Sequence, residues 1–393
     1  MCIRDRPYDV LNTDEARAMA EGRPWSFLHI SKPEIDLPPE TDPYDASVYA
    51  KGAENFQRMV DEGVLLRDPT DCYYAYRITM GDHQQTGLVA GASVAAYDRN
   101  DVRKHEYTRP KKEDDRVRQI DALNAQTGPV FLTYKGHDVV DGILGSVSNG
   151  NPQVDVTLGD GVRHELWVID QSDLIRQLTD AFDDMGVIYV ADGHHRSAAA
   201  SRVAAMRRGD GSDPEASYEY FLTVIFPDHQ MQILDYNRVI RDLNALQPDE
   251  FLQRVQQVFD CQPSAEPVKP MAMGTFGIYL PGQWYALKID PEKVPNDPVK
   301  RLDVSVLADN LIEPILGISD PRTDERIDFV GGIRGLRELE RRVDSGEMSV
   351  AFSLYPTSIS DLMAVADDDQ VMPPKSTWCE PKLADGMVSK VLD

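Results

Sequence analysis

The chain has 393 residues, of which 41% are hydrophobic and 27% are charged, an ordinary globular composition with room for two domains. Its 66 acidic and 41 basic residues give a formal net charge of -25, which argues against general electrostatic binding to nucleic acid or to an anionic membrane. Any anion would therefore have to be bound by a local group of basic residues.

The cysteines and the N-terminus indicate a cytoplasmic protein. The four cysteines contain no CxxC pair and predict neither a zinc site nor a redox dithiol; they are Cys2, Cys72, Cys261 and Cys379. No apolar run approaches the roughly 18 residues that cross a membrane, and the first residues lack the apolar region of a signal peptide. Residues 1–6, MCIRDR, fit no pattern, and we expect either that they are non-native or that the true N-terminus is missing.

The first part of the chain alternates predicted helices and strands. A short helix is expected over 13–22, a strand followed by a proline-rich loop over 25–43, and a longer helix over 46–63. Further strands are predicted at 72–80, 86–97, 129–134, 164–169, 187–191 and 220–226, and further helices at 110–128, 172–186 and 197–209. This alternation predicts an α/β architecture.

The pattern changes after about residue 244. Residues 220–226 and 231–240 read as a pair of strands around PDHQ, and 275–289 as a hairpin around Pro-Gly. Helices are predicted at 246–261, 302–317 and 335–346, a strand at 348–355, and a turn at 330–335. The predicted fold is therefore mixed α/β, with an N-terminal α/β region over 7–242 and a C-terminal α+β region over 243–393.

The stretch DGHHR, residues 192–196, joins a predicted strand to a predicted helix. Free backbone N–H groups at a helix start attract anions, and Gly193 would let the backbone approach one closely. Without a ligand, cationic charge on His194, His195 or Arg196 would oppose the helix dipole by roughly 0.3–1 kcal/mol each. A bound phosphate would reverse that sign, and Asp192 would cap the helix or hold an accompanying metal.

Two other interpretations of DGHHR stay open at this point. In one of them, Asp192 is a plain helix cap with surface histidines beside it. A metal site made from the two histidines is disfavoured, because adjacent helical residues point about 100° apart and metal-binding pairs prefer a spacing of four.

A second segment, residues 101–116, is the densest basic run in the chain. It places His105 and Glu106 among Arg103 and several other cations, which would keep a carboxylate ionised. Glu106 is our candidate general base for a hydroxyl, with His105 and His195 as assisting groups. Arg103 is a candidate phosphate ligand. The alternative is a solvated charge cluster at a helix start.

A third segment, residues 372–382, carries three prolines and is expected to be an extended, stiff strap. Lys375, Ser376, Thr377 and Lys382 offer donors to a phosphate. A purely structural C-terminal strap explains the same residues equally well.

Five ordered motifs together resemble one family. They are PYDVLNTDEARAMAEGRPWSFLHISKPEIDLP, VRKHEYTRPKKEDDR, VADGHHRSAAASR, LDVSVLADNLIEPILGI and MPPKSTWCEPKL. They resemble the DUF1015 family, also labelled SpoOJ/ParA/ParB/repB, from Pro7 to the C-terminus. The label implies a relation to the ParB/sulfiredoxin-like fold, in which a strand–turn–helix binds nucleotide phosphates.

DGHHR looks similar to that turn in the free-serine kinases of the same superfamily, which transfer a phosphoryl group from a nucleotide to serine. The resemblance carries Asp192, Gly193, His194, His195 and Arg196 to a phosphate-binding role. It carries no catalytic carboxylate, so Glu106 is chosen on chemistry alone. A DNA-binding role is disfavoured by the charge and the lack of a convincing helix-turn-helix, and a sulfiredoxin role by the lack of a cysteine in the turn.

The expected function is a nucleotide-dependent small-molecule kinase that uses ATP or ADP with Mg²⁺ and a small hydroxyl acceptor such as serine. Asp192 is the candidate metal ligand. Neither nucleic acid nor a membrane is expected as a partner. Two alternatives stay open, a nucleotide-binding regulatory protein without turnover and a hydrolase of nucleotides or phosphate esters.

Overall fold

The computed structural model describes residues 4–5, 7–209 and 213–393. Of the six residues expected to be non-native, 1–3 and 6 lie outside the described residues, and Cys2 lies there with them. The described chain forms a mixed α/β structure of two compact units, one made of residues 1–231 and 381–393 and the other of residues 232–380. Our expected division at 242/243 differs from these bounds and remains a prediction about domains.

The first unit is built on an eight-stranded mixed sheet with the order β3-β8-β5-β9-β2-β1-β7-β6. Its strands are β1 (Tyr73–Met80), β2 (His83–Ser93), β3 (Val102–Arg103), β5 (Val130–Tyr134), β6 (Val154–Thr157), β7 (Arg163–Ile169), β8 (Ile188–Asp192) and β9 (Tyr220–Pro227). A separate two-stranded sheet pairs β4 (Ala125–Gln126) with β18 (Lys390–Val391). The C-terminal residues are thereby fixed to this unit.

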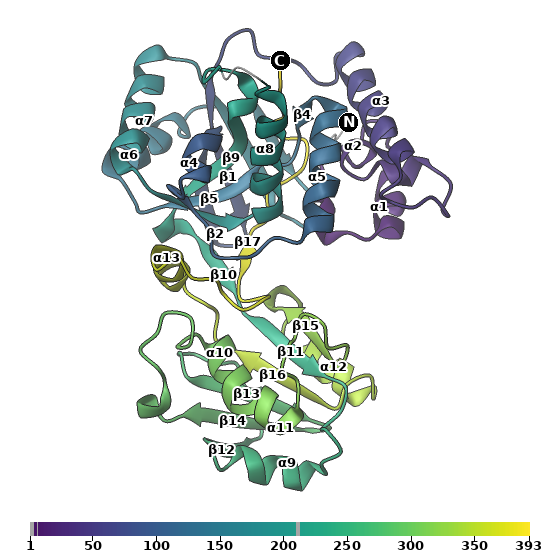
Figure 1. Cartoon of the computed structure of the whole chain (residues 1–393), viewed down its shortest axis with the longest axis vertical. Coiled ribbons are helices and arrows are strands. Elements are labelled where there is room, and N and C mark those ends of the chain that lie inside the picture. Colours follow the sequence, from purple (N-terminus) through teal and green to yellow (C-terminus); the bar gives the residue numbers. More distant parts are fainter. Residues whose placement is uncertain (1–3, 6, 210–212) are drawn as a thin grey trace. The chain divides into compact units, whose positions relative to one another are not determined.

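The helices of the first unit are α1 (Thr13–Ala20), α2 (Leu28–Ser31), α3 (Ala46–Asp61), α4 (Val94–Asp98), α5 (Pro110–Leu123), α6 (Asp138–Val147), α7 (Ser172–Met185) and α8 (His194–Arg207). Figure 1 shows α5 and α8 side by side in front of the sheet, and the two helices pack on each other. The apolar core includes Leu132, Val190, Ala200 and Phe221. Because α8 presents alanines to this core, it can lie close on the strands.

The second unit contains a six-stranded antiparallel sheet with the order β12-β14-β13-β16-β11-β15, and a short pair of β10 with β17. Its strands are β10 (Gln232–Leu234), β11 (Tyr236–Ile240), β12 (Phe259–Ser264), β13 (Thr275–Leu280), β14 (Gln283–Ile289), β15 (Ile327–Gly331), β16 (Val350–Leu354) and β17 (Trp378–Glu380). Its helices are α9 (Pro248–Val255), α10 (Asp303–Leu307), α11 (Glu313–Leu316), α12 (Leu336–Asp344) and α13 (Ile359–Asp367).

The prediction of a strand within 25–43 is wrong. The segment forms α2 and a 3-10 turn over Pro33–Asp36, and its apolar side chains Phe27, Leu28 and Ile30 are fully buried. Proline lacks the N–H that a strand donates to its neighbour, and Pro33 opens the 3-10 turn instead. The predicted strand 86–97 also ends early, because the Ser93 side chain caps α4 at the backbone N–H of Ala96.

The expected pairing of 220–226 with 231–240 is also wrong. β9 pairs with β2 and β5, whereas β10 pairs with β17 and β11 with β15 and β16. All residues of β9 except the first are buried. Because β2 and β5 pair with its two edges, β9 has no edge left to pair with 231–240. The connection is a 3-10 turn over Asp228–Gln230 rather than a two-residue hairpin.

The predicted helix 302–317 is interrupted by a π-helical segment over Ala308–Ile312 between α10 and α11. Pro314 lacks the N–H for an ordinary helical bond and its ring clashes with the preceding turn, which a locally wider helix relieves. The hairpin predicted at 275–289 is confirmed as β13 and β14. The helices predicted at 46–63 and 172–186 are confirmed as α3 and α7. The helix predicted at 110–128 is confirmed as α5 only to Leu123, because Asn124 adopts the left-handed conformation and strand β4 follows.

Candidate functional site

Two adjacent parallel strands bring the second and first sequence motifs together. β3 pairs with β8 in parallel, with Val102 opposite Ile188 and Arg103 opposite Tyr189. The carboxyl ends of parallel neighbours meet at one edge of the sheet. Residues 104–109, here called the Glu106 segment, therefore leave the sheet beside the DGHHR turn.

The turn itself is built around Gly193. This residue has φ +96°, a backbone conformation that residues other than glycine rarely adopt, and it is the N-cap of α8. Its carbonyl accepts hydrogen bonds from the backbone N–H groups of Arg196 (2.8 Å) and Ser197 (3.1 Å). No described side chain caps α8, and its first turn contains no acidic residue. The helix start therefore presents N–H groups to an incoming anion.

Asp192 ends β8 and does not cap α8. Its Oδ2 accepts a hydrogen bond from Lys382 Nζ at 2.9 Å. Burial would raise the pKa of Asp192, but the charges of Lys382 and Arg196 outweigh it and hold that pKa well below its usual value. Asp192 is thus a carboxylate, and Lys382 adds a second cation to the turn.

His194 is buried, with 4% exposure, and it points to the Glu106 segment. Its Nε2 accepts a hydrogen bond from the backbone N–H of His105 at 3.5 Å, and the two rings meet edge to face with centroids 4.5 Å apart. Burial and the neighbouring His105 ring lower the pKa of His194 well below its ordinary value. Its ring is therefore neutral at pH 7, with Nε2 unprotonated.

His195 holds the other end of the same segment. Its Nε2 accepts a hydrogen bond from the backbone N–H of Arg109 at 3.0 Å. Burial and the Lys112 charge lower the pKa of His195. In this arrangement the cationic character expected of the two histidines is lost, and Arg196 and Lys382 supply the positive charge.

Arg196 lies along the turn and extends toward a cavity. A Cβ placed on Gly193 would lie 3.1 Å from Arg196 Nε and 3.3 Å from its Cζ, and Nη1 donates a hydrogen bond to the Pro129 carbonyl. The cavity has a volume of about 30 Å³, room for roughly two water molecules. Such a space is too small for a nucleotide but fits a small polar group.

The cavity is lined by residues of α5, α8 and β9, and by Tyr8 and Asp385 from segments far apart in the sequence. Its polar and charged lining residues are Tyr8, Ser31, Arg116, Gln119, Gln126, Thr127, Arg196 and Asp385. Arg116 donates to Asp115 Oδ2 from Nε (3.0 Å) and Nη2 (2.6 Å), and its Cζ lies 4.5 Å from the Tyr8 ring centroid. Tyr8 is held by Asp385, whose Oδ2 accepts the Tyr8 N–H at 3.2 Å.

These cavity residues were not found by sequence reasoning. Tyr8 belongs to the PYDV motif and Arg116 to the basic segment, so both stood in quoted motifs. Their contact joins positions 108 residues apart, which no local pattern reveals. Lys382 does not line the cavity; the sequence offered it as a phosphate donor, but not its ion pair with Asp192, which spans 190 residues.

The remaining predicted residues fall into two groups. Glu106 is exposed between two anchored residues, His105 is 1% exposed, and Arg103 is half-buried in β3. Lys375, Ser376 and Thr377 belong to the second unit, where Arg238 Nη2 donates to the Lys375 carbonyl and Thr357 Oγ1 to the Ser376 carbonyl. Their role in phosphate binding stays a prediction.

Among the described residues, no group of three or more histidine, cysteine, aspartate or glutamate side chains is arranged to hold a metal ion. The helices of the described chain are all too short or too polar to traverse a lipid bilayer. Asp192 alone would serve a cation at the turn, which suits Mg²⁺ only if the ion's other ligands are phosphate oxygens and water.

A family model described as "Protein of unknown function (DUF1015)" matches residues 3–305. None of the curated proteins matches the chain. A free serine kinase in complex with AMP is similar in structure, with 13% identity, a TM-score of 0.36 and coverage of 74% of this chain and 86% of that one.

Two further solved structures are similar to this chain. A conserved hypothetical protein from Pyrococcus furiosus has 12% identity, a TM-score of 0.36 and coverage of 76% of this chain and 93% of its own. SbnI with a C-terminal truncation, from Staphylococcus aureus, has 11% identity, a TM-score of 0.39 and coverage of 74% and 82%. Identities and TM-scores this low say nothing about the substrate of this chain.

Proposed function

The chain belongs to the DUF1015 family of proteins of unknown function, and on that premise we propose a function from its own residues. We propose that it binds a nucleotide, ATP or ADP, at the DGHHR turn and transfers a phosphoryl group to a small hydroxyl compound such as serine. The observation that carries the proposal is the uncapped start of α8 with Arg196 folded along Gly193.

Phosphate binding is supported by the chemistry of the turn. The first backbone N–H groups of α8 and the helix dipole favour negative charge, and Gly193 lets a phosphate oxygen approach the backbone. Arg196 and Lys382 add charge in a protein whose formal net charge is -25. The backbone of His194 and His195, rather than their rings, would donate to the phosphate.

Phosphoryl transfer is supported by a carboxylate and a small cavity near the turn. Glu106 would orient or deprotonate the acceptor hydroxyl from the Glu106 segment. The cavity beside Arg196 and Arg116 has room for roughly two water molecules and would receive one polar group of the acceptor rather than the whole molecule. Arg196, which lines both the turn and the cavity, would stabilise the charge that develops between donor and acceptor.

Mg²⁺ fits this proposal through Asp192 and the phosphates. The ion would neutralise charge on the transferring group, as it does in phosphoryl transfer generally. Lys382 competes for the same carboxylate at 2.9 Å and would have to move aside or share it. The three described cysteines are free thiols, which accords with the cytoplasm that we propose as the compartment.

Calorimetric titration of the full chain with ATP and with ADP tests the nucleotide site. We expect saturable binding that Arg196→Gln weakens by about tenfold or more, because a hydrogen bond to a charged group contributes roughly 1.5–3 kcal/mol. Arg207→Gln, in the last turn of the same helix, is the control and should leave affinity unchanged. Equal affinity in wild type and Arg196→Gln would exclude the turn as the nucleotide site.

Incubation with ATP or ADP and a panel of hydroxyl compounds then separates the three candidate functions. A phosphorylated acceptor supports the kinase, and Glu106→Gln should abolish its formation without loss of nucleotide affinity. Inorganic phosphate released without an acceptor product indicates a hydrolase. Saturable binding with unchanged nucleotide after long incubation indicates a regulatory protein and contradicts the kinase.

A further inference from the structure

Resting on the proposed function, we infer that His194 and His195 are positioning residues whose rings hold the Glu106 segment on the phosphate turn. The backbone of these two residues faces the proposed phosphate, and their side chains face the segment with the candidate carboxylate. The DGHHR turn would thus set the distance between donor phosphate and general base.

The geometry of the two hydrogen bonds carries this inference. His194 Nε2 accepts the backbone N–H of His105, and His195 Nε2 accepts the backbone N–H of Arg109. Glu106 lies between these two anchored residues. A five-residue stretch tied at both ends can shift far less than a loop tied at one end only.

Two adjacent histidines suit this role for the same reason that they do not suit a metal. Neighbouring side chains on a helix diverge by about 100°, so they cannot converge on one ion but can reach two separate points. His194 turns inward, where it meets the buried His105 ring, and the half-buried His195 reaches the outer end of the segment.

Electrostatics keep both rings neutral, the form in which Nε2 can accept a hydrogen bond. A protonated histidine has no acceptor nitrogen, so either ring would release its N–H partner on protonation. The positive end of the α8 dipole and burial both disfavour the cation. The charged groups that face His195 are Lys112, Glu113, Arg109 and Arg196.

Hydrogen–deuterium exchange of the full chain tests the tie directly, with His195→Leu and His195→Gln as the variants. Leucine removes the acceptor, whereas glutamine offers an oxygen near the position of Nε2. We expect faster exchange over residues 104–110 in His195→Leu and recovery in His195→Gln. Ser201→Ala is the matched control, since it removes another α8 side-chain bond, to Asp98 at 2.7 Å.

Activity and affinity measurements separate positioning from binding. His195→Leu should keep nucleotide affinity within about twofold and lower kcat on the order of 100-fold, the effect of a misplaced catalytic group. His195→Gln should recover most of kcat. As pH falls, wild type should lose kcat and gain exchange over 104–110, corrected for intrinsic rates, and His195→Gln should show smaller changes because only the His194 ring is left to protonate.

Two results would overturn the inference. Exchange over 104–110 unchanged in His195→Leu would show that the ring does not hold the segment. Nucleotide affinity lost in both variants would show that the ring itself binds phosphate. Failure of the proposed function is distinct, because it appears as absent transfer in wild type while the exchange measurements still report on the tie.

Discussion

The rings of His105 and His194 meet edge to face, at 89° and with centroids 4.5 Å apart, in the buried interior behind the DGHHR turn. His105 is 1% exposed, so its ring is almost completely removed from solvent. Burial lowers the pKa of His105 to about 4, with the Val190 backbone and Asp192 opposing that shift. Both rings are therefore neutral when the protein is folded at pH 7.

This pair predicts a loss of stability in mild acid. A histidine with a folded pKa below its unfolded value of 6.5 binds fewer protons when folded, so stability falls as the pH drops from about 6.5 to about 4. A shift of this size corresponds to about 3 kcal/mol for His105. Scanning calorimetry at pH 7.0 and 5.0 should give a smaller difference in Tm for His105→Phe than for wild type. An equal difference would contradict the prediction.

The sequence patterns predicted the strand–glycine–helix geometry of the DGHHR turn because its cause is local. A strand, a glycine and an alanine-rich helix follow one another within about twenty residues, and the described β8, Gly193 and α8 agree with that pattern. Helices with clear apolar spacing and a terminal glycine or proline were predicted for the same reason.

The directions of the histidine rings could not be predicted from the sequence. Their partners are backbone N–H groups 89 and 86 residues away, and a backbone N–H has no signature in the sequence. The partner strands of β9 were missed for a related reason, since neighbours in the chain are not always neighbours in a sheet. The cavity depends on contacts among Tyr8, Arg116 and Asp385, which lie far apart in the sequence.

A buried carboxyl group in the second unit predicts the opposite pH dependence. Burial raises the pKa of Asp303 to about 7, although the Gly274 N–H donates to its Oδ1 at 2.8 Å. Its Oδ2 has no partner among the described residues, and neither do Arg301 Nε and Ser305 Oγ. An acid with a folded pKa above its unfolded value of 3.8 favours folding at low pH, so stability falls as the pH rises from about 4 to about 7.

Asp303→Asn removes this ionisation and keeps an oxygen for Gly274. Relative to wild type, the variant should gain on the order of 4 kcal/mol of unfolding free energy between pH 4 and pH 8. Denaturant unfolding at both pH values measures the difference. If the difference in unfolding free energy between the two proteins is the same at pH 4 and at pH 8, Asp303 does not titrate in this range.

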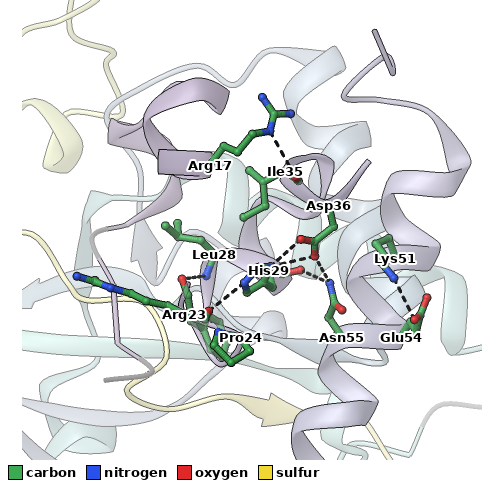
Figure 2. Close-up of polar contacts among 12 residues, drawn as sticks. Arg17, Arg23, Pro24, Leu28, His29, Ile35, Asp36, Lys51, Glu54 and Asn55 are labelled. Carbon is green, nitrogen blue, oxygen red and sulfur yellow. Dashed lines mark hydrogen bonds and ion pairs between the residues drawn. The ribbon is translucent and has the colours of Figure 1, made fainter. Parts of the chain in front are cut away.

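His29 and Asp36 form an ion pair near the N-terminus that Figure 2 shows in detail. His29 Nδ1 lies 2.8 and 3.0 Å from the two Asp36 oxygens, and its Nε2 lies 3.1 Å from the Arg23 carbonyl. Asn55 donates to Asp36 and to the His29 carbonyl, both at 2.8 Å. Acceptors at both ring nitrogens require the doubly protonated ring, which suits a structural tie and not a general base.

The hydrogen bond to Asp36 raises the pKa of His29, and burial opposes that shift only in part. The tie therefore stabilises the fold below about pH 6.5, and this stabilisation is lost as the pH rises through the folded pKa. Asp36→Asn should lower the His29 titration midpoint measured by NMR. Lys51→Gln, which removes a nearby ion pair with Glu54, is the control. An unchanged midpoint in Asp36→Asn would refute the pairing.

Gly193 offers the sharpest separation of stability from binding, because Gly186 provides a matched comparison. Both glycines have positive φ, +96° at Gly193 and +71° at Gly186, so alanine at either position should cost about 1–2 kcal/mol of unfolding free energy. A Cβ at Gly186 would meet no atom within 4 Å, whereas one at Gly193 would press on Arg196 Nε at 3.1 Å. Alanine at Gly193 would also displace the guanidinium and fill the approach to the α8 N–H groups.

We therefore expect similar Tm losses in Gly193→Ala and Gly186→Ala, and a loss of ATP affinity of about tenfold or more in Gly193→Ala alone. Calorimetry and titration on the two variants check both halves, and equal ATP affinity in the two would mean that the nucleotide does not use this turn.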